Sequence, residues 1–253
     1  MTRSEMIALC REEESTAQAG GNLDRLLKTN RMQADAPPWN YRETVIPHMR
    51  EAKAYVDMGI GNGEAIANFK VIPFHANATE KDPANIDAAR RRLIGLGIKV
   101  HPVASEEDMP FQDGYFQLIT SYHTRFDASE LYRVARKDCV FITEQIGSGD
   151  GIALNQMLET RRPPDERQWN LAAALRDLQN AGFIVQEARE SEPVLRFYDA
   201  GALVHYAILH PNMFPGFSVK NKADALYAVQ RHIDTHSYAA AKAKRFLIIA
   251  KKE

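Results

Sequence analysis

The stretch Tyr55-Val56-Asp57-Met58-Gly59-Ile60-Gly61-Asn62-Gly63 decides the fold, because an apolar run ends there in an acid and three glycines. Apolar residues before the acid suit a strand that is buried on both faces of a parallel sheet. The glycines after it let the backbone turn sharply beneath a ligand. The stretch therefore predicts a nucleotide-binding crevice at the carboxyl end of a strand.

The spacing of the glycines indicates which nucleotide is bound. A dinucleotide fingerprint, Gly-x-Gly-x-x-Gly, would need a glycine at Glu64, and the third glycine falls one residue earlier. The Gly-Lys-Ser/Thr ending of a P-loop does not follow. The remaining pattern, Asp-x-Gly-x-Gly-x-Gly, resembles the first motif of class I S-adenosylmethionine-dependent methyltransferases. An ordinary strand-to-helix turn is the alternative interpretation.

A second stretch, residues 74–83, is interpreted as the next strand and ends in an acid about twenty residues after the glycines. In the methyltransferase family, an acid at this place accepts hydrogen bonds from both ribose hydroxyls, and Glu80 matches it. A carboxylate suits two adjacent hydroxyls because it has two acceptor oxygens. The alternative is a solvated acid in a loop.

Two further blocks extend the resemblance. Residues 107–119, Glu-Asp-Met-Pro-Phe-Gln-Asp-Gly-Tyr-Phe-Gln-Leu-Ile, are similar to the family's acidic-acidic-Leu-Pro-Phe-x-Asp-Gly-x-Phe-Asp segment, which leads into strand four. Residues 130–136 resemble the helix that precedes strand five. The four blocks agree in order and separation over residues 54–146, which is more specific than any one motif.

The pattern of strands and helices predicts an α/β fold. Helical patterns lie between most of the expected strands, which implies right-handed crossovers and a doubly wound, Rossmann-like, mostly parallel sheet. The family resemblance adds a seventh strand that runs antiparallel. The expected strands are residues 54–58, 74–79, 99–103, 116–121, 140–145, 183–188 and 245–250.

Capping and breaking residues predict the helices. The expected helices are residues 4–19, 22–32, 41–52 with an interruption at Pro47, 84–96 after the cap Asp82, 129–136, 152–160, and 169–181 beyond Pro163-Pro164.

Four segments are expected. They are an N-terminal helical cap (1–52), a cofactor-binding core (53–190), a lid or substrate insertion (191–243) and the last core strand (244–253). The insertion is rich in aromatic residues, with a helix expected from Asp199 and an exposed loop at 210–217. It either roofs the active site or forms a helical satellite that buries its own aromatic residues.

The resemblance implies a set of site residues. The cofactor-binding candidates are Asp57, Gly59, Gly61, Asn62, Gly63, Glu80, Lys81, Ser105, Glu106 and Ser121, and the substrate-binding candidates are Trp39, Tyr41, Tyr122, His205 and Phe214. His123, just beyond strand four, is the candidate general base for a hydroxyl or acidic carbon. A structural histidine, and aromatic residues that only seal helices onto the sheet, are the alternatives.

Three positions depart from the family pattern. Ser105, followed by Glu106, stands where an Asp or Asn usually contacts the adenine edge. Gln117 replaces the usual acid of strand four, and Lys137-Asp138-Cys139 replaces a Pro-Gly-Gly turn before strand five. None of these departures affects the glycine loop or Glu80.

Composition limits the function further. The chain has 32 Lys and Arg against 33 Asp and Glu, and its densest basic run, Arg90-Arg91-Arg92, falls on a helix expected to cover the sheet, so a nucleic-acid partner is not expected. Cys10 and Cys139 are far apart and lack metal-ligand spacing, which fits a reducing compartment and predicts no metal. No apolar run approaches a membrane span, and residues 1–14 lack the apolar core of a signal peptide. A cytoplasmic monomer or homodimer without a membrane partner is expected.

These observations predict an S-adenosylmethionine-dependent methyltransferase for a small-molecule acceptor, with a core resembling the ubiquinone/menaquinone-biosynthesis type. Three alternatives stay open. One is an RNA or protein methyltransferase, although strand four lacks the Asn/Asp-Pro-Pro-Tyr/Phe sequence of the amino-directed enzymes. The second is a non-catalytic S-adenosylmethionine-binding protein. The third is a nucleotide-dependent oxidoreductase, which Glu64 disfavours.

Overall fold

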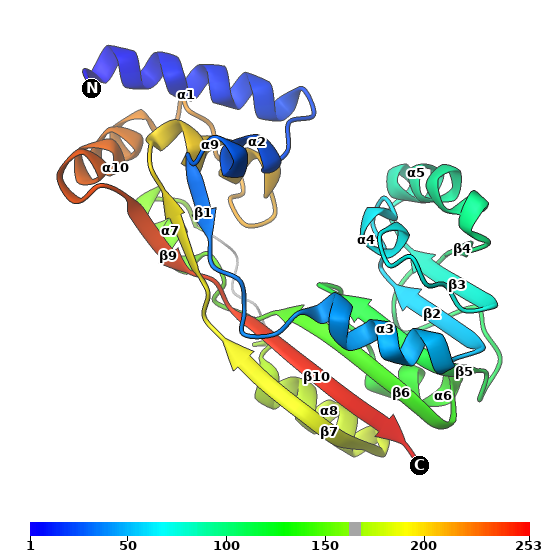
Figure 1. Ribbon diagram of the computed structural model, residues 1–253. Coiled ribbons are helices and arrows are strands. Elements are labelled where there is room, and N and C mark those ends of the chain that lie inside the picture. The colour runs from blue at the N-terminus through cyan, green and yellow to red at the C-terminus, as the bar shows by residue number, and fades with distance from the viewer. Residues whose placement is uncertain (162–167) are drawn as a thin grey trace. The chain divides into compact units, whose positions relative to one another are not determined.

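The computed structural model describes residues 1–161 and 168–253 and divides the chain into two compact units (Figure 1). The small unit comprises Met1–Pro37, Gly149–Arg167 and Glu192–Lys244. The sheet unit comprises Pro38–Ser148, Gln168–Ser191 and Arg245–Glu253. In the described ranges, no helix combines the length and the apolar character that crossing a membrane requires.

The sheet unit is built on one seven-stranded sheet with the order β4-β3-β2-β5-β6-β10-β7. The pairs from β4 to β6 are parallel, whereas β10 runs antiparallel to both β6 and β7. This is the predicted doubly wound, mostly parallel architecture with an antiparallel last strand. The strands are β2 Ala54–Met58, β3 His75–Glu80, β4 Lys99–Pro102, β5 Phe116–Tyr122, β6 Ala135–Ile146, β7 Phe183–Ser191 and β10 Arg245–Lys252.

Alternate side chains of the central strands enter two apolar cores on opposite faces of the sheet. Tyr55 of β2 belongs to one core with residues of α3, α4 and α5, and Val56 belongs to the other with residues of α6 and α8. All five residues of β2 are buried, as expected for an internal parallel strand. The helices are α3 Tyr41–Glu51, α4 Glu64–Ala67, α5 Pro83–Leu93, the 3-10 turn η1 Ile94–Leu96, α6 Ala128–Val134 and α8 Leu171–Ala181.

The small unit has a core of its own. A three-stranded antiparallel sheet with the order β1-β8-β9 packs with helices whose apolar side chains share one cluster. The strands are β1 Met32–Ala34, β8 Val194–Phe197 and β9 Ala239–Lys242. The helices are α1 Arg3–Gln18, α2 Asp24–Lys28, α7 Ile152–Met157, α9 Ala200–Leu209 and α10 Ala223–His236.

Some local predictions were wrong. The helix expected to continue toward Met32 ends at Lys28, because residues 32–34 pair with β8 instead. The helix over residues 41–52 is not interrupted, since α3 continues through Pro47. The loop at 210–217 is not simply exposed, because Phe214 is buried in the core of the small unit.

The expected segments are distributed differently between the units. Residues 1–37 belong to the small unit, whereas α3 belongs to the sheet unit. All of the expected insertion except Ser191 lies in the small unit, where it forms one compact body with residues 1–37 and 149–161. The expected break at Pro163-Pro164 lies outside the described residues.

Candidate functional site

The glycine loop follows β2 within the sheet unit. Gly59, Gly61 and Gly63 all have left-handed backbones, with φ of 61°, 56° and 77°. A Cβ on Gly59 would lie 2.2 Å from the Thr124 hydroxyl oxygen, and one on Gly63 would lie 3.0 Å from Leu93 of α5. A Cβ on Gly61 would meet nothing within 4 Å. Two glycines therefore serve close packing, and Gly61 presents bare backbone with open space beside it.

Glu80, the last residue of β3, meets this loop. Its carboxylate is almost fully buried and accepts backbone N–H bonds from Gly61 at 2.6 Å and from Lys81 and Asp82 at 2.9 Å each. A carboxylate has about four acceptor positions, so about one stays available while the Gly61 bond is made. The structure thus brings together the glycine loop and Glu80, the two features on which the predicted nucleotide site depends. A ligand diol could use the available position and compete for the one that Gly61 occupies.

Asp57 lies beneath the loop on β2, directly opposite Thr120 of β5. The Thr120 hydroxyl donates to the Asp57 carboxylate at 2.7 Å, and the Tyr55 hydroxyl lies 2.7 Å from the same Thr120 oxygen. Burial raises the pKa of Asp57 to about 7, although the hydrogen bonds from Thr120 and the Met58 backbone lower it. A nearby cation would favour the ionised form of this carboxyl.

A second buried acid, Glu144 on β6, holds two of the predicted site residues. Its Oε2 accepts from the Trp39 indole N–H at 2.7 Å, and its Oε1 lies 3.1 Å from His123 Nε2. The backbone oxygen of Glu144 also accepts the His123 N–H at 2.8 Å. His123 has a φ of 61°, a strained conformation for a residue other than glycine. One glutamate therefore fixes both the backbone and the ring of His123.

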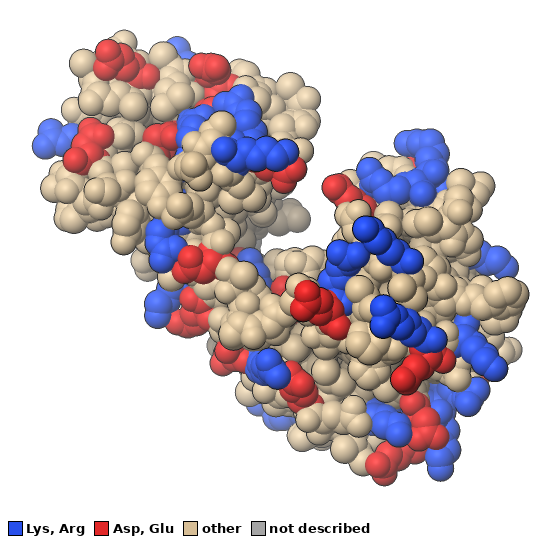
Figure 2. Space-filling model, viewed as in Figure 1, with Lys and Arg blue, Asp and Glu red and all other residues tan. Residues whose placement is uncertain are grey.

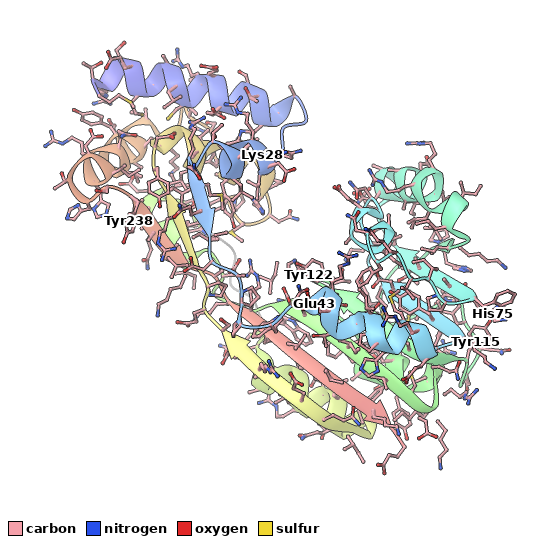
Figure 3. The ribbon with its side chains drawn as sticks, viewed as in Figure 1. Lys28, Glu43, His75, Tyr115, Tyr122 and Tyr238 are labelled. Carbon is pink, nitrogen blue, oxygen red and sulfur yellow. The ribbon has the colours of Figure 1, made fainter. Side chains whose placement is uncertain are left out.

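Two tyrosines complete this cluster. The ring of Tyr122 stacks on His123 with centroids 3.9 Å apart and lies 4.9 Å from the ring of Tyr41. In Figure 3, Tyr122 is drawn near the start of α3, whose first residue, Tyr41, contacts it. Burial, together with the charge on Glu144, raises the pKa of both tyrosines, so both hydroxyls stay protonated at neutral pH. The predicted residues Trp39, Tyr41, Tyr122 and His123 thus form one contiguous group, defined here as the aromatic cluster.

The other predicted cofactor residues have local partners. Ser121 is completely buried, and its hydroxyl donates to the Thr124 backbone oxygen at 2.5 Å. The side chain of Asn62 accepts from the Glu64 N–H at 3.0 Å, which starts α4. Three more of these residues, Lys81, Ser105 and Glu106, follow β3 and β4 in the chain. Lys81 forms an ion pair with Glu106 at 3.5 Å, and the Ser105 hydroxyl accepts from the Glu107 N–H at 3.2 Å.

Two predicted substrate residues belong to the small unit and are engaged there. Both ring nitrogens of the fully buried His205 have partners, Glu13 at 2.9 Å and the Asn22 carbonyl at 3.2 Å. Phe214 is buried beside Tyr206 in the same core. These contacts favour structural roles for His205 and Phe214 over contact with a substrate, because neither side chain has exposed surface to offer.

Glu144 is the site residue that sequence reasoning missed. The only local signal was an acid near the carboxyl end of an otherwise apolar strand, Val140-Phe141-Ile142-Thr143-Glu144. Buried acids are rare unless they are paired, so an acid at such a position is expected to have a partner. Its partners are 105 and 21 residues away in the chain, and spacing alone could not reveal them.

Comparisons with known proteins support the fold. No protein-family model matches the sequence, and a search of the curated proteins finds no match. Solved structures do match. The YcgJ protein from Bacillus subtilis is 14% identical over 84% of this chain and 98% of its own, with a TM-score of 0.60. A putative methyltransferase from Bacillus halodurans C-125 is 16% identical over 83% and 99%, with a TM-score of 0.56.

A third structure covers more of the chain. The geranyl diphosphate C-methyltransferase from Streptomyces coelicolor A3(2), crystallised with S-adenosyl-L-homocysteine, is 14% identical over 95% of this chain and 84% of its own, with a TM-score of 0.52. At such identities the likeness concerns the fold alone. The chain therefore has the Rossmann-like fold of class I methyltransferases.

Proposed function

We propose that this protein is an S-adenosylmethionine-dependent methyltransferase that acts on a small-molecule acceptor. The observation that carries the proposal is the meeting of Gly61 and Glu80 at the tips of two neighbouring parallel strands. Bare backbone with open space lies there beside a buried carboxylate that keeps acceptor capacity. That combination suits the sugar of a nucleoside.

The charge of the site also fits this cofactor. Asp57, Glu80 and Glu144 are three buried carboxyls toward the carboxyl ends of β2, β3 and β6, and β5 separates β6 from β2. A sulfonium cation would be attracted by such acids and would favour the ionised form of Asp57. When bound, the cofactor supplies an electrophilic methyl group, and the chain's task is to hold the acceptor in line with it.

The aromatic cluster supports a small acceptor. Trp39 is buried, and Tyr41 and Tyr122 retain part of their surface, so flat apolar walls stand beside the polar groups of His123 and Glu144. Small-molecule sites combine such walls with a few polar anchors. On the face drawn in Figure 2, basic and acidic side chains are interspersed over both units, which gives no support to a nucleic-acid acceptor.

The dinucleotide alternative has a structural counterargument. In that fingerprint the third glycine allows close packing of a helix on the loop. Here Gly63 takes this place, one residue early, with Leu93 and Ala89 of α5 against it. Glu64 then begins α4.

Titration calorimetry with S-adenosylhomocysteine tests the proposal. We expect binding by the wild-type protein and no binding of NAD. Glu80→Ala should weaken the affinity about 10- to 100-fold, since hydrogen bonds to a charged group contribute about 1.5–3 kcal/mol each. Asp87→Ala, which removes an exposed carboxylate of α5, is the matched control and should bind normally. Absence of S-adenosylhomocysteine binding by the wild type would refute the cofactor assignment. Unchanged affinity in Glu80→Ala would refute the role of Glu80.

A further inference from the structure

Glu144 is a buried acid with a partner at each oxygen of its carboxyl group. Only about 5% of the residue is exposed. One carboxylate oxygen accepts from the Trp39 indole and the other faces His123 Nε2. Because each oxygen has its own partner, the carboxylate cannot turn without breaking a hydrogen bond.

The chemistry of these partners fixes where the imidazole carries its proton. An ionised carboxylate only accepts hydrogen bonds, so His123 Nε2 must be the protonated nitrogen if the 3.1 Å contact is a hydrogen bond. A neutral imidazole has one N–H, and its lone pair is then on Nδ1. The partner of one ring nitrogen thus decides the function of the other.

The backbone shows that this arrangement is imposed. His123 keeps a left-handed φ of 61° while its N–H donates to the Glu144 carbonyl and its ring is stacked on Tyr122. Such a conformation is unfavourable for a residue other than glycine and persists only where the surroundings determine it. Strained residues of this kind concentrate at functional sites.

We propose that Glu144 is a positioning residue that holds His123 in the Nε2–H tautomer, so that Nδ1 takes the proton of the methyl acceptor. The proposal rests on the proposed function and narrows it to acceptors with an acidic O–H or C–H. Tertiary amines and thioethers have no proton to lose and need no such base.

The reaction step balances. The acceptor oxygen or carbon loses its proton to His123 Nδ1, and its electron pair forms the new bond to the methyl carbon. The bond between that carbon and sulfur breaks, with its electrons on sulfur. The imidazolium formed is stabilised by Glu144 and returns its proton to water. Three further titratable groups lie near this cluster: Tyr122 stacks on the ring, Tyr41 contacts Tyr122, and the charge of Arg245 acts on Tyr122. Tyr41 is also subject to the charge of Asp57.

Nitrogen-15 NMR of the protein without ligands tests the tautomer directly. Signals of His123 are assigned by their loss in His123→Asn. We expect the neutral ring of the wild type to carry its proton on Nε2. In Glu144→Gln the amide can donate as well as accept, so the Nδ1–H form should become detectable. Glu190→Gln, an exposed residue of β7, is the control and should leave the spectrum unchanged.

Two results would overturn the proposal: a proton on Nδ1 in the wild type, or an unaltered Nε2–H tautomer in Glu144→Gln. If Glu144→Gln does not fold, Glu144→Asp gives the same readout, because its shorter side chain draws the carboxylate away from the ring. The measurement needs no cofactor. Failure here therefore leaves the calorimetric test of the proposed function intact, and failure of that test leaves the tautomer result standing.

Discussion

Asp57 links the candidate site to the stability of the sheet unit. Burial raises its pKa from 3.8 to about 7. Between these values the folded protein retains a proton that the unfolded chain has released, so raising the pH disfavours folding. The stability that protonated Asp57 contributes is fully present below the pKa of this group in the unfolded chain. It is lost as the pH rises through the pKa of Asp57 in the folded protein. The rise in the pKa of Asp57 from 3.8 to about 7 corresponds to about 4 kcal/mol of folding free energy.

We therefore expect Asp57→Asn to be less sensitive to pH than the wild type. The amide cannot ionise and still accepts from the Thr120 hydroxyl. Urea unfolding at a series of pH values between 4 and 8 measures the difference. As the pH rises, the free energy of unfolding of the variant should increase relative to that of the wild type. Parallel curves would show that Asp57 titrates normally in the folded protein.

At the scale of elements, α6 holds the segment Met109-Pro110-Phe111, which precedes β5. The guanidinium of Arg133 binds both carboxylate oxygens of Glu130 at 2.6–2.7 Å and donates to the carbonyls of Met109 and Phe111 at 3.0 and 2.7 Å. Glu130 in turn accepts the Met109 N–H at 2.6 Å. The planar guanidinium of Arg133 in α6 therefore fixes residues 109–111, which belong to the segment that resembles the methyltransferase family.

Arg133→Lys should release this segment, because an ammonium cannot reproduce the bidentate geometry. The expected loss in the free energy of unfolding is about 1–3 kcal/mol, the range for hydrogen bonds to a charged group. Urea unfolding measures it, and limited proteolysis should show faster cleavage within residues 105–114. Arg136→Lys, an exposed substitution three residues further on, is the control. Equal stability of the two variants would contradict the anchoring role of Arg133.

Elements with local signals were predictable from the sequence. Strand β2 matches its expected bounds, because the apolar run before Asp57 is a local signal and all five residues of the strand are buried. Helix α5 begins after the cap Asp82 and its following turn ends at the left-handed Gly97. By contrast, β1 exists only because it pairs with β8, some 160 residues later, and its three residues carry no signal of their own.

The site divides in the same way. The meeting of Gly61 with Glu80 was predictable because carboxyl ends of neighbouring parallel strands share one edge. The partnership of Trp39 with Glu144 was not, because no periodicity or spacing joins residues on separate elements. What each of these residues binds stays a prediction.

At the scale of the whole molecule, the small unit is assembled from three separate stretches of chain. Its core contains apolar residues from all three, and the buried Glu13 of α1 accepts from Arg25, Arg31 and His205. The longest of these links joins residues 192 apart. Because its parts are far apart in the chain, this unit was not predictable from the sequence, although the helix that begins after Asp199 was expected.

Because the units have separate cores, we expect thermal unfolding to show two transitions. Glu13→Ala should lower the free energy of unfolding of the small unit alone, by about 1–3 kcal/mol, since it removes the carboxylate that holds the buried His205 and the partly buried Arg31. S-adenosylhomocysteine at 100 times its dissociation constant should raise only the other transition, by about 2.7 kcal/mol. Differential scanning calorimetry measures both effects, and Glu12→Ala, an exposed residue of α1, is the matched control. A single transition that responds to the variant and to the ligand alike would instead mean that the small unit and the sheet unit unfold together. Stability at the candidate site would then depend on Glu13 as much as on Asp57.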